Sequence, residues 1–122
     1  MKKILHAPGL VLIAVCGLVC CVCCLERAEK WFAVLQTISK TQAATMTLAP
    51  GKSSGPKGNE HPKSDQVLLV LEGEVLAEIG SEKQTLRRGD VVIVPAGAAH
   101  RFTNHGKSNA ITFNVYAPPA YD

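Results

Sequence analysis

The chain has 122 residues, of which 47% are hydrophobic and 19% are charged, and its formal net charge is +3. This length allows one domain with its own hydrophobic core, and the composition excludes a disordered chain. Aromatic residues make up only 5% of the chain and the basic residues form no run longer than a pair, so a nucleic-acid partner is not expected.

The N-terminal part is an apolar segment. Residues 7–25 (APGLVLIAVCGLVCCVCCL) carry no charge over 19 positions. A helix of that length rises about 28 Å, close to the ~30 Å hydrocarbon core of a bilayer. We therefore expect residues 1–25 to be a helical membrane anchor or signal segment, residues 26–30 a charged linker, and residues 31–122 the folded domain. The protein would then be membrane-anchored or exported. A mis-assigned start would leave it cytoplasmic.

All five cysteines lie between Cys16 and Cys24, inside this apolar segment. A disulfide framework would spread its cysteines over the domain, so we expect the folded domain to contain no disulfide. CCVCC includes two C-x-x-C spacings, but no second pair or nearby histidine completes a zinc set. The cysteines are therefore interpreted as small apolar residues of the segment.

From Trp31 onward the sequence is typical of short strands separated by turns. Gly51–Asn59 is rich in glycine and is predicted to be a loop, and Glu72-Gly73 and Ser81–Gln84 are predicted to be turns. No amphipathic helix is indicated. About eight strands are predicted, at or around residues 31–38, 43–50, 66–71, 75–79, 85–86, 91–94, 100–104 and 110–116. This pattern predicts an all-β sandwich or barrel.

Strand periodicity also groups side chains by face. On a strand, Gln66, Leu68 and Val70 share one face, and His100 and Phe102 share another. These polar residues could thus face a cavity whose other walls are apolar, which is the usual construction of a small-molecule site.

The segment GDVVIVPAGAAHRFTN carries a spaced motif. Gly89, Pro95, Gly97, His100 and Asn104 stand in the spacing G-x5-P-x-G-x2-H-x3-N. This spacing resembles the second motif of the cupin superfamily. We expect the glycines and the proline to set the turns that aim the strands.

The other cupin motif, G-x5-H-x-H-x3,4-E-x6-G, is matched in part. Counting back from Gly73 places Gln66 where the family has glutamate, His61 at the second histidine and Asn59 at the first. The resemblance covers about residues 31–116.

The resemblance implies a cupin-type jelly-roll barrel around one divalent metal ion, such as Fe, Mn, Ni, Cu or Zn, and it implies a homodimer. His61 and His100 would be imidazole ligands, Gln66 would take the place of the carboxylate, and Asn59 would take the place of the missing histidine. Two amides neutralise none of the charge of a dication, so metal binding is expected to be weak or absent. Glu60 is a possible substitute ligand.

Two classes of function follow from this resemblance. The first is a metal-dependent enzyme acting on a small molecule, of dioxygenase or isomerase type. The alternative is a non-catalytic ligand-binding or sensing protein with a degraded metal site. The altered first motif favours the alternative, and the substrate is not predicted.

Overall fold

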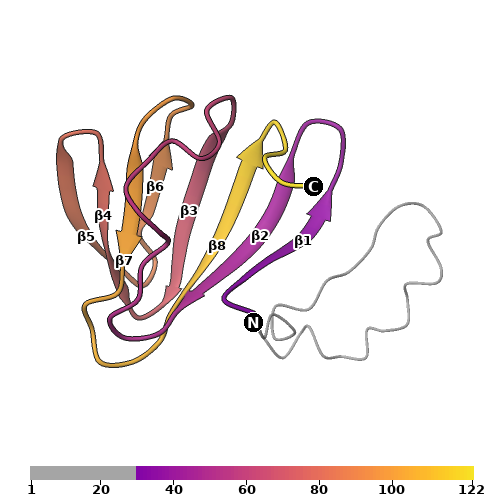
Figure 1. Cartoon of the computed structure of the whole chain (residues 1–122). Helices are drawn as coiled ribbons and strands as arrows, with labels where there is room; N and C mark the ends of the chain where they lie inside the picture. Colours follow the sequence, from indigo (N-terminus) through magenta and orange to yellow (C-terminus); the bar gives the residue numbers. More distant parts are fainter. Residues whose placement is uncertain (1–29) are drawn as a thin grey trace, which may run out of the picture.

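The computed structural model describes residues 30–122, which form two antiparallel sheets (Figure 1). The strands are β1 (Phe32–Thr37), β2 (Gln42–Leu48), β3 (Asp65–Glu72), β4 (Glu74–Ile79), β5 (Glu82–Arg87), β6 (Val91–Val94), β7 (His100–Thr103) and β8 (Ala110–Ala117). The all-β prediction for the domain is confirmed.

The segment predicted as an anchor or signal, residues 1–25, lies outside the described residues, as does the predicted linker 26–30 apart from Lys30. Both assignments stay predictions. Within residues 30–122, no helix has the length and hydropathy needed to cross a bilayer.

The larger sheet has the strand order β1-β2-β8-β3-β6 and the smaller one β5-β4-β7. Their facing sides enclose the core, because period-2 alternation along each strand turns every second side chain inward. On β3, Gln66, Leu68 and Val70 are 3%, 0% and 1% exposed, so the predicted shared face is the inner one. His100 and Phe102 likewise both point inward from β7.

The interior changes character along the barrel. The apolar part is formed by Met46, Leu48, Leu68, Val70, Val75, Ala77, Leu86, Val94, Phe102 and Ala110. Toward the ends of β3 and β8 the same inner faces carry Gln66, Asn114 and Tyr116. Gln66 is paired with Tyr116 and, on its other side, with Val94. Gln66, Asn114 and Tyr116 therefore form a polar part of the interior beside this apolar cluster.

The turn predicted at Ser81–Gln84 is wrong. The turn lies at Gly80 and Ser81, and β5 runs from Glu82 to Arg87. On β5 only Leu86 is buried, so the strand lacks the alternation that identifies strands in a sequence. Its extended form comes from backbone pairing with β4, which continues from Arg87 to Glu82.

The long connection between β2 and β3 positions the site. It runs beside β7, with isolated bridges pairing Ser53 with Thr103 and Gly58 with His100 (Figure 1). The backbone N–H of Gly58 donates to the His100 carbonyl, and the N–H of His100 donates back to Gly58. This pairing brings the next residues of the connection, including His61, over the end of β7.

Candidate functional site

Two histidines from distant parts of the sequence face each other at the polar end of the barrel. Their ring centroids are 4.7 Å apart, and His61 and His100 are only 5% and 8% exposed. His100 opens β7, and His61 begins a turn in which the N–H of Ser64 donates to the His61 carbonyl. The structure thus brings together the two residues predicted as imidazole ligands.

The ring of His100 is held by one nitrogen. Nδ1 lies 2.9 Å from the carbonyl oxygen of Ala98, so Nδ1 carries the proton and donates it. Burial lowers the pKa of His100, and the nearby His61 lowers it further, while the Ala98 hydrogen bond and Glu60 act in the opposite direction. A neutral ring leaves the lone pair of Nε2 free on the side away from Ala98.

His61 lies between two acceptor groups. Its Nδ1 is 3.2 Å from the Ser64 carbonyl oxygen, and its Nε2 is 3.0 Å from Oε1 of Gln66. A neutral imidazole has only one N–H, so it can donate to one of these oxygens but not to both.

A chain of buried hydrogen bonds fixes which atom Gln66 presents to His61. A backbone carbonyl, that of Met46, can only accept, so the Thr112 hydroxyl donates to it. Thr112 Oγ1 then accepts from Nδ2 of Asn114, and Oδ1 of Asn114 accepts from Nε2 of Gln66. Gln66 Oε1 is therefore the atom left to face His61.

A proton or a metal ion is needed between His61 Nε2 and Gln66 Oε1. With Nδ1 donating to Ser64, the lone pairs of His61 Nε2 and Gln66 Oε1 point at each other unless a proton or a metal ion satisfies both. Without an ion, their separation of 3.0 Å is that of a hydrogen bond in which His61 Nε2–H donates to Gln66 Oε1. Two imidazoles and an amide oxygen would be suitable ligands for a borderline transition-metal dication, and they would bind it weakly because all three are neutral.

The histidines open into a cavity of about 400 Å³. It is lined by Trp31, Phe32, Met46, Ser54, Glu60, His61, Gln66, His100, Phe102, Tyr116 and Tyr121. The Tyr116 ring packs edge-on against His61, at 5.0 Å between centroids, and against Tyr121, at 5.1 Å. Burial raises the pKa of Tyr116 far above its usual value, so this phenol stays protonated.

Gln42 fixes the C-terminal residues at this cavity. Its side-chain oxygen accepts from the backbone N–H groups of Ala120 and Tyr121, and its amide donates to the Tyr121 carbonyl and to Thr37 Oγ1. Because Gln42 is itself only 1% exposed, these bonds are shielded from water. These hydrogen bonds therefore hold Tyr121 in place as part of the cavity wall.

The remaining predicted residues lie elsewhere. Asn59 is exposed and does not line the cavity, whereas the neighbouring Glu60 does line it. Asn104 of the second motif is buried, and its side chain donates to the Leu48 and Ser108 carbonyls, which holds a loop in place. His105 is an exposed loop residue, as expected.

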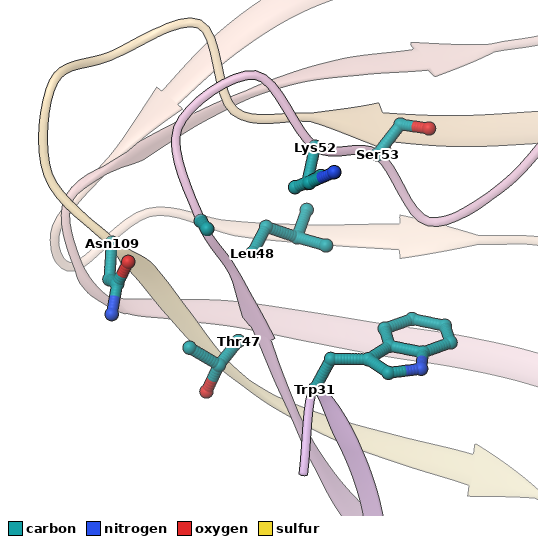
Figure 2. A pocket seen from close by; sticks show the side chains of 7 residues that line it. Trp31, Thr47, Leu48, Lys52, Ser53 and Asn109 are labelled. Atoms are coloured by element: carbon teal, nitrogen blue, oxygen red, sulfur yellow. The ribbon is translucent and has the colours of Figure 1, made fainter. Parts of the chain in front are cut away.

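A second cavity, of about 490 Å³, is lined by Trp31, Thr47, Leu48, Ala49, Lys52, Ser53 and Asn109 (Figure 2). Figure 2 shows the Trp31 ring and the Leu48 side chain on its walls, with Lys52 above them. It holds no imidazole and no carboxylate. The cavity with the paired histidines is therefore the stronger candidate site, although it is the smaller of the two.

The sequence did not predict the roles of Thr112 and Asn114, the two residues that orient the Gln66 side chain. Both are fully buried polar residues on β8. The alternation of AITFNVYA contained a signal, because Thr112, Asn114 and Tyr116 occupy every second position and so share one face. That signal did not say which polar groups they would meet.

Comparison with known proteins agrees with this architecture. Residues 44–116 match the profile of the cupin domain. An uncharacterised protein of Streptomyces coelicolor is 31% identical over 94 residues, covering 77% of this chain and 88% of that protein. The auxin-binding protein ABP19b of Prunus persica is 33% identical over 75 residues, covering 54% of this chain. The chain spans only 36% of the length of that plant protein and 31% of a germin-like protein of Morus alba.

Solved structures share the fold. A Bacillus halodurans protein superposes with a TM-score of 0.73 at 26% identity, covering 80% of this chain and 76% of that one. The protein TT1209 of Thermus thermophilus gives 0.68 at 30% identity, covering 77% and 93%. The family profile covers more than half of the chain, and the motif residues His61 and His100 meet inside the barrel. The chain therefore belongs to the cupin family.

Proposed function

We propose that this cupin domain is a small-molecule-binding protein whose cavity also holds a divalent transition-metal ion, through His61, His100 and Gln66. The observation that carries this proposal is that two buried imidazole rings, 4.7 Å apart, and the carbonyl oxygen of Gln66 meet at the cavity. When bound, such an ion would polarise an oxygen or nitrogen atom of the ligand. The protein itself supplies the two oriented rings and an apolar wall.

The donor set favours binding over oxidative catalysis. Oxygen-activating iron sites commonly use two histidines and a carboxylate, with open positions for the substrate. Here Gln66 stands in the place of the carboxylate, and within residues 30–122 no three His, Cys, Asp or Glu side chains form a cluster able to hold a metal. The plant relatives named as auxin-binding proteins also support a binding role.

A metal titration tests this proposal. The full chain, with its five cysteines replaced by serine so that only the barrel is measured, is titrated calorimetrically with Zn²⁺ or Ni²⁺. We expect one weak site per chain. Removing either ring, by His61→Ala or His100→Ala, should weaken binding by tenfold or more, since each loses one of the imidazole ligands.

The matched control is His105→Ala, because His105 is exposed and lies outside the cavity. This variant should bind the metal as the parent does. Equal affinity in all four proteins, or no binding to the parent, would rule out the metal site.

We further propose that the chain forms a homodimer through the outer face of the larger sheet. Val91 and Ile93 on the edge strand β6 are 56% and 60% exposed. They pair with Leu69 and Val67 of β3, which are half-buried on the same face. A continuous exposed apolar surface of this kind commonly marks a protein–protein contact.

Sedimentation equilibrium should detect the dimer, and Ile93→Lys should shift the population toward monomer by at least tenfold in the dissociation constant, since a buried lysine at the contact lacks a partner. Thr85→Lys, on the exposed strand β5, is the control and should leave the dimer intact. A parent protein that is monomeric at all concentrations would refute the dimer.

A further inference from the structure

The outer part of the site cavity is built differently from its interior. His61, Gln66, His100, Phe102 and Tyr116 are all buried. The part open to solvent, here termed the pocket mouth, consists of Trp31, Phe32, Ser54, Glu60 and Tyr121. Three of these five residues are aromatic, and Glu60 is the one carboxylate among them.

The aromatic rings of the pocket mouth form one connected group. The Phe32 ring lies 4.9 Å from that of Tyr121 and 5.8 Å from that of Trp31, with the ring planes tilted at 60° and 49°. The rings are thus not stacked flat upon one another. Rings tilted in this way do not cover one another's faces as stacked rings do, and the faces carry the negative side of the aromatic quadrupole.

No described residue forms an ion pair with Glu60. Within residues 30–122 it makes no hydrogen bond or ion pair, although the two ion pairs present, Arg87–Glu74 and Arg101–Glu78, join other carboxylates. Its field reaches the cavity, because it contributes to raising the pKa of Tyr116 and of Tyr121. No lysine or arginine is present among the described residues that line this cavity.

These features select a ligand by charge. An anion would meet an unpaired carboxylate and no basic side chain. A neutral molecule would leave the carboxylate unpaired beside it. An organic cation would satisfy the carboxylate and contact the ring faces at once, a combination that aromatic sites for ammonium groups use.

We propose that the pocket mouth binds the ammonium group of an organic amine, beside Glu60 and the rings of Trp31, Phe32 and Tyr121, with the apolar remainder of the amine inside the cavity. This inference rests on the proposed function only in that the cavity takes a small molecule. It needs no metal ion, so it is tested on chelator-treated protein, whereas the metal titration tests the histidines.

Three probes of similar shape test the effect of ligand charge on binding: benzylammonium is a cation, benzyl alcohol is neutral and benzoate is an anion. Trp31 is the single tryptophan of the chain and lines both cavities, so its fluorescence reports binding, and the variants below show at which cavity the ligand binds. We expect benzylammonium to bind the full chain about tenfold more tightly than benzyl alcohol, and benzoate to bind least, from the combined carboxylate and cation–π attraction.

Substitutions show which residues cause the preference for benzylammonium. Glu60→Gln should remove most of the preference for benzylammonium, whereas Glu82→Gln, on the exposed strand β5, should keep it. Tyr121→Phe should keep the preference, because the ring remains, and Tyr121→Leu should reduce it. The Gln42 bonds to the backbone of Tyr121 remain possible in both variants.

Equal or tighter binding of benzyl alcohol or benzoate would overturn the proposal. So would a preference that survives Glu60→Gln, or the absence of benzylammonium binding at millimolar concentrations. If metal binding is meanwhile normal, only this inference fails. If benzylammonium binds and metal does not, the metal site fails and the ammonium site stands.

Discussion

Gly73→Ala should reduce the free energy of unfolding by more than about 3 kcal/mol. Gly73 turns the chain from β3 of the larger sheet into β4 of the smaller one, with φ of +75°. An alanine Cβ there would lie 2.7 Å from the Asn109 carbonyl oxygen and 3.0 Å from the Cα of Ala110. Both atoms belong to the backbone, so the strained residue cannot be relieved by turning a side chain. Urea denaturation, followed by circular dichroism, measures the loss.

Gly80→Ala is the matched control. Gly80 also has a positive φ, +59°, but an added Cβ would find nothing within 4 Å. Its cost should be only the left-handed backbone penalty of about 1–2 kcal/mol. Equal losses in the two variants would show that the close approach of the Asn109 backbone contributes nothing.

Asn114→Leu should damage the site more than any other change outside the cavity. Leucine has a similar size but can neither accept from Gln66 Nε2 nor donate to Thr112 Oγ1. A buried donor without a partner costs about 1–3 kcal/mol of stability. The Gln66 amide also loses the bond that orients it, so we expect metal affinity to fall by tenfold or more.

Asn114→Asp separates orientation from packing. A carboxylate oxygen can still accept from Gln66 Nε2, so Oε1 should continue to face His61 and metal affinity should stay well above that of Asn114→Leu. The ¹⁵N chemical shifts of the His61 ring, which report the protonated nitrogen, should change in Asn114→Leu and not in Asn114→Asp. Unchanged shifts and affinity in Asn114→Leu would contradict the role given to the hydrogen-bond chain.

The strands with strong local signals were predictable. Four consecutive β-branched residues, VVIV, identify β6, and alternation places Gln66 and His100 on inner faces. The glycines predicted to set turns do so, since Gly73, Gly89 and Gly97 all have positive φ. The polar strand β5 was not predictable, because its backbone is extended by pairing with β4 rather than by burial of alternate side chains.

The first cupin motif shows that residue spacing alone does not predict which side chains reach the site. Counting back from Gly73 placed Asn59 and His61 at the two histidine positions of the motif. The structure has a bend and a turn there instead of a strand, so only His61 is buried and Asn59 points to solvent. Residues in an irregular connection take their direction from tertiary contacts, here the pairing of Gly58 with His100.

The sequence by itself determined that the domain is all-β and which side chains share an inner face, because periodicity and turn residues are local properties. The choice of His61 and His100 as site residues came from the resemblance to the two cupin motifs. Tertiary structure alone decided which atoms those histidines meet. The amide of Gln66 is aimed by a carbonyl on β2 through two side chains of β8, and the pocket mouth joins β1 to a C-terminal tail held by Gln42. Apart from the bond between Asn114 and Thr112, these contacts link residues 48 to 79 positions apart, and no local pattern encodes their direction.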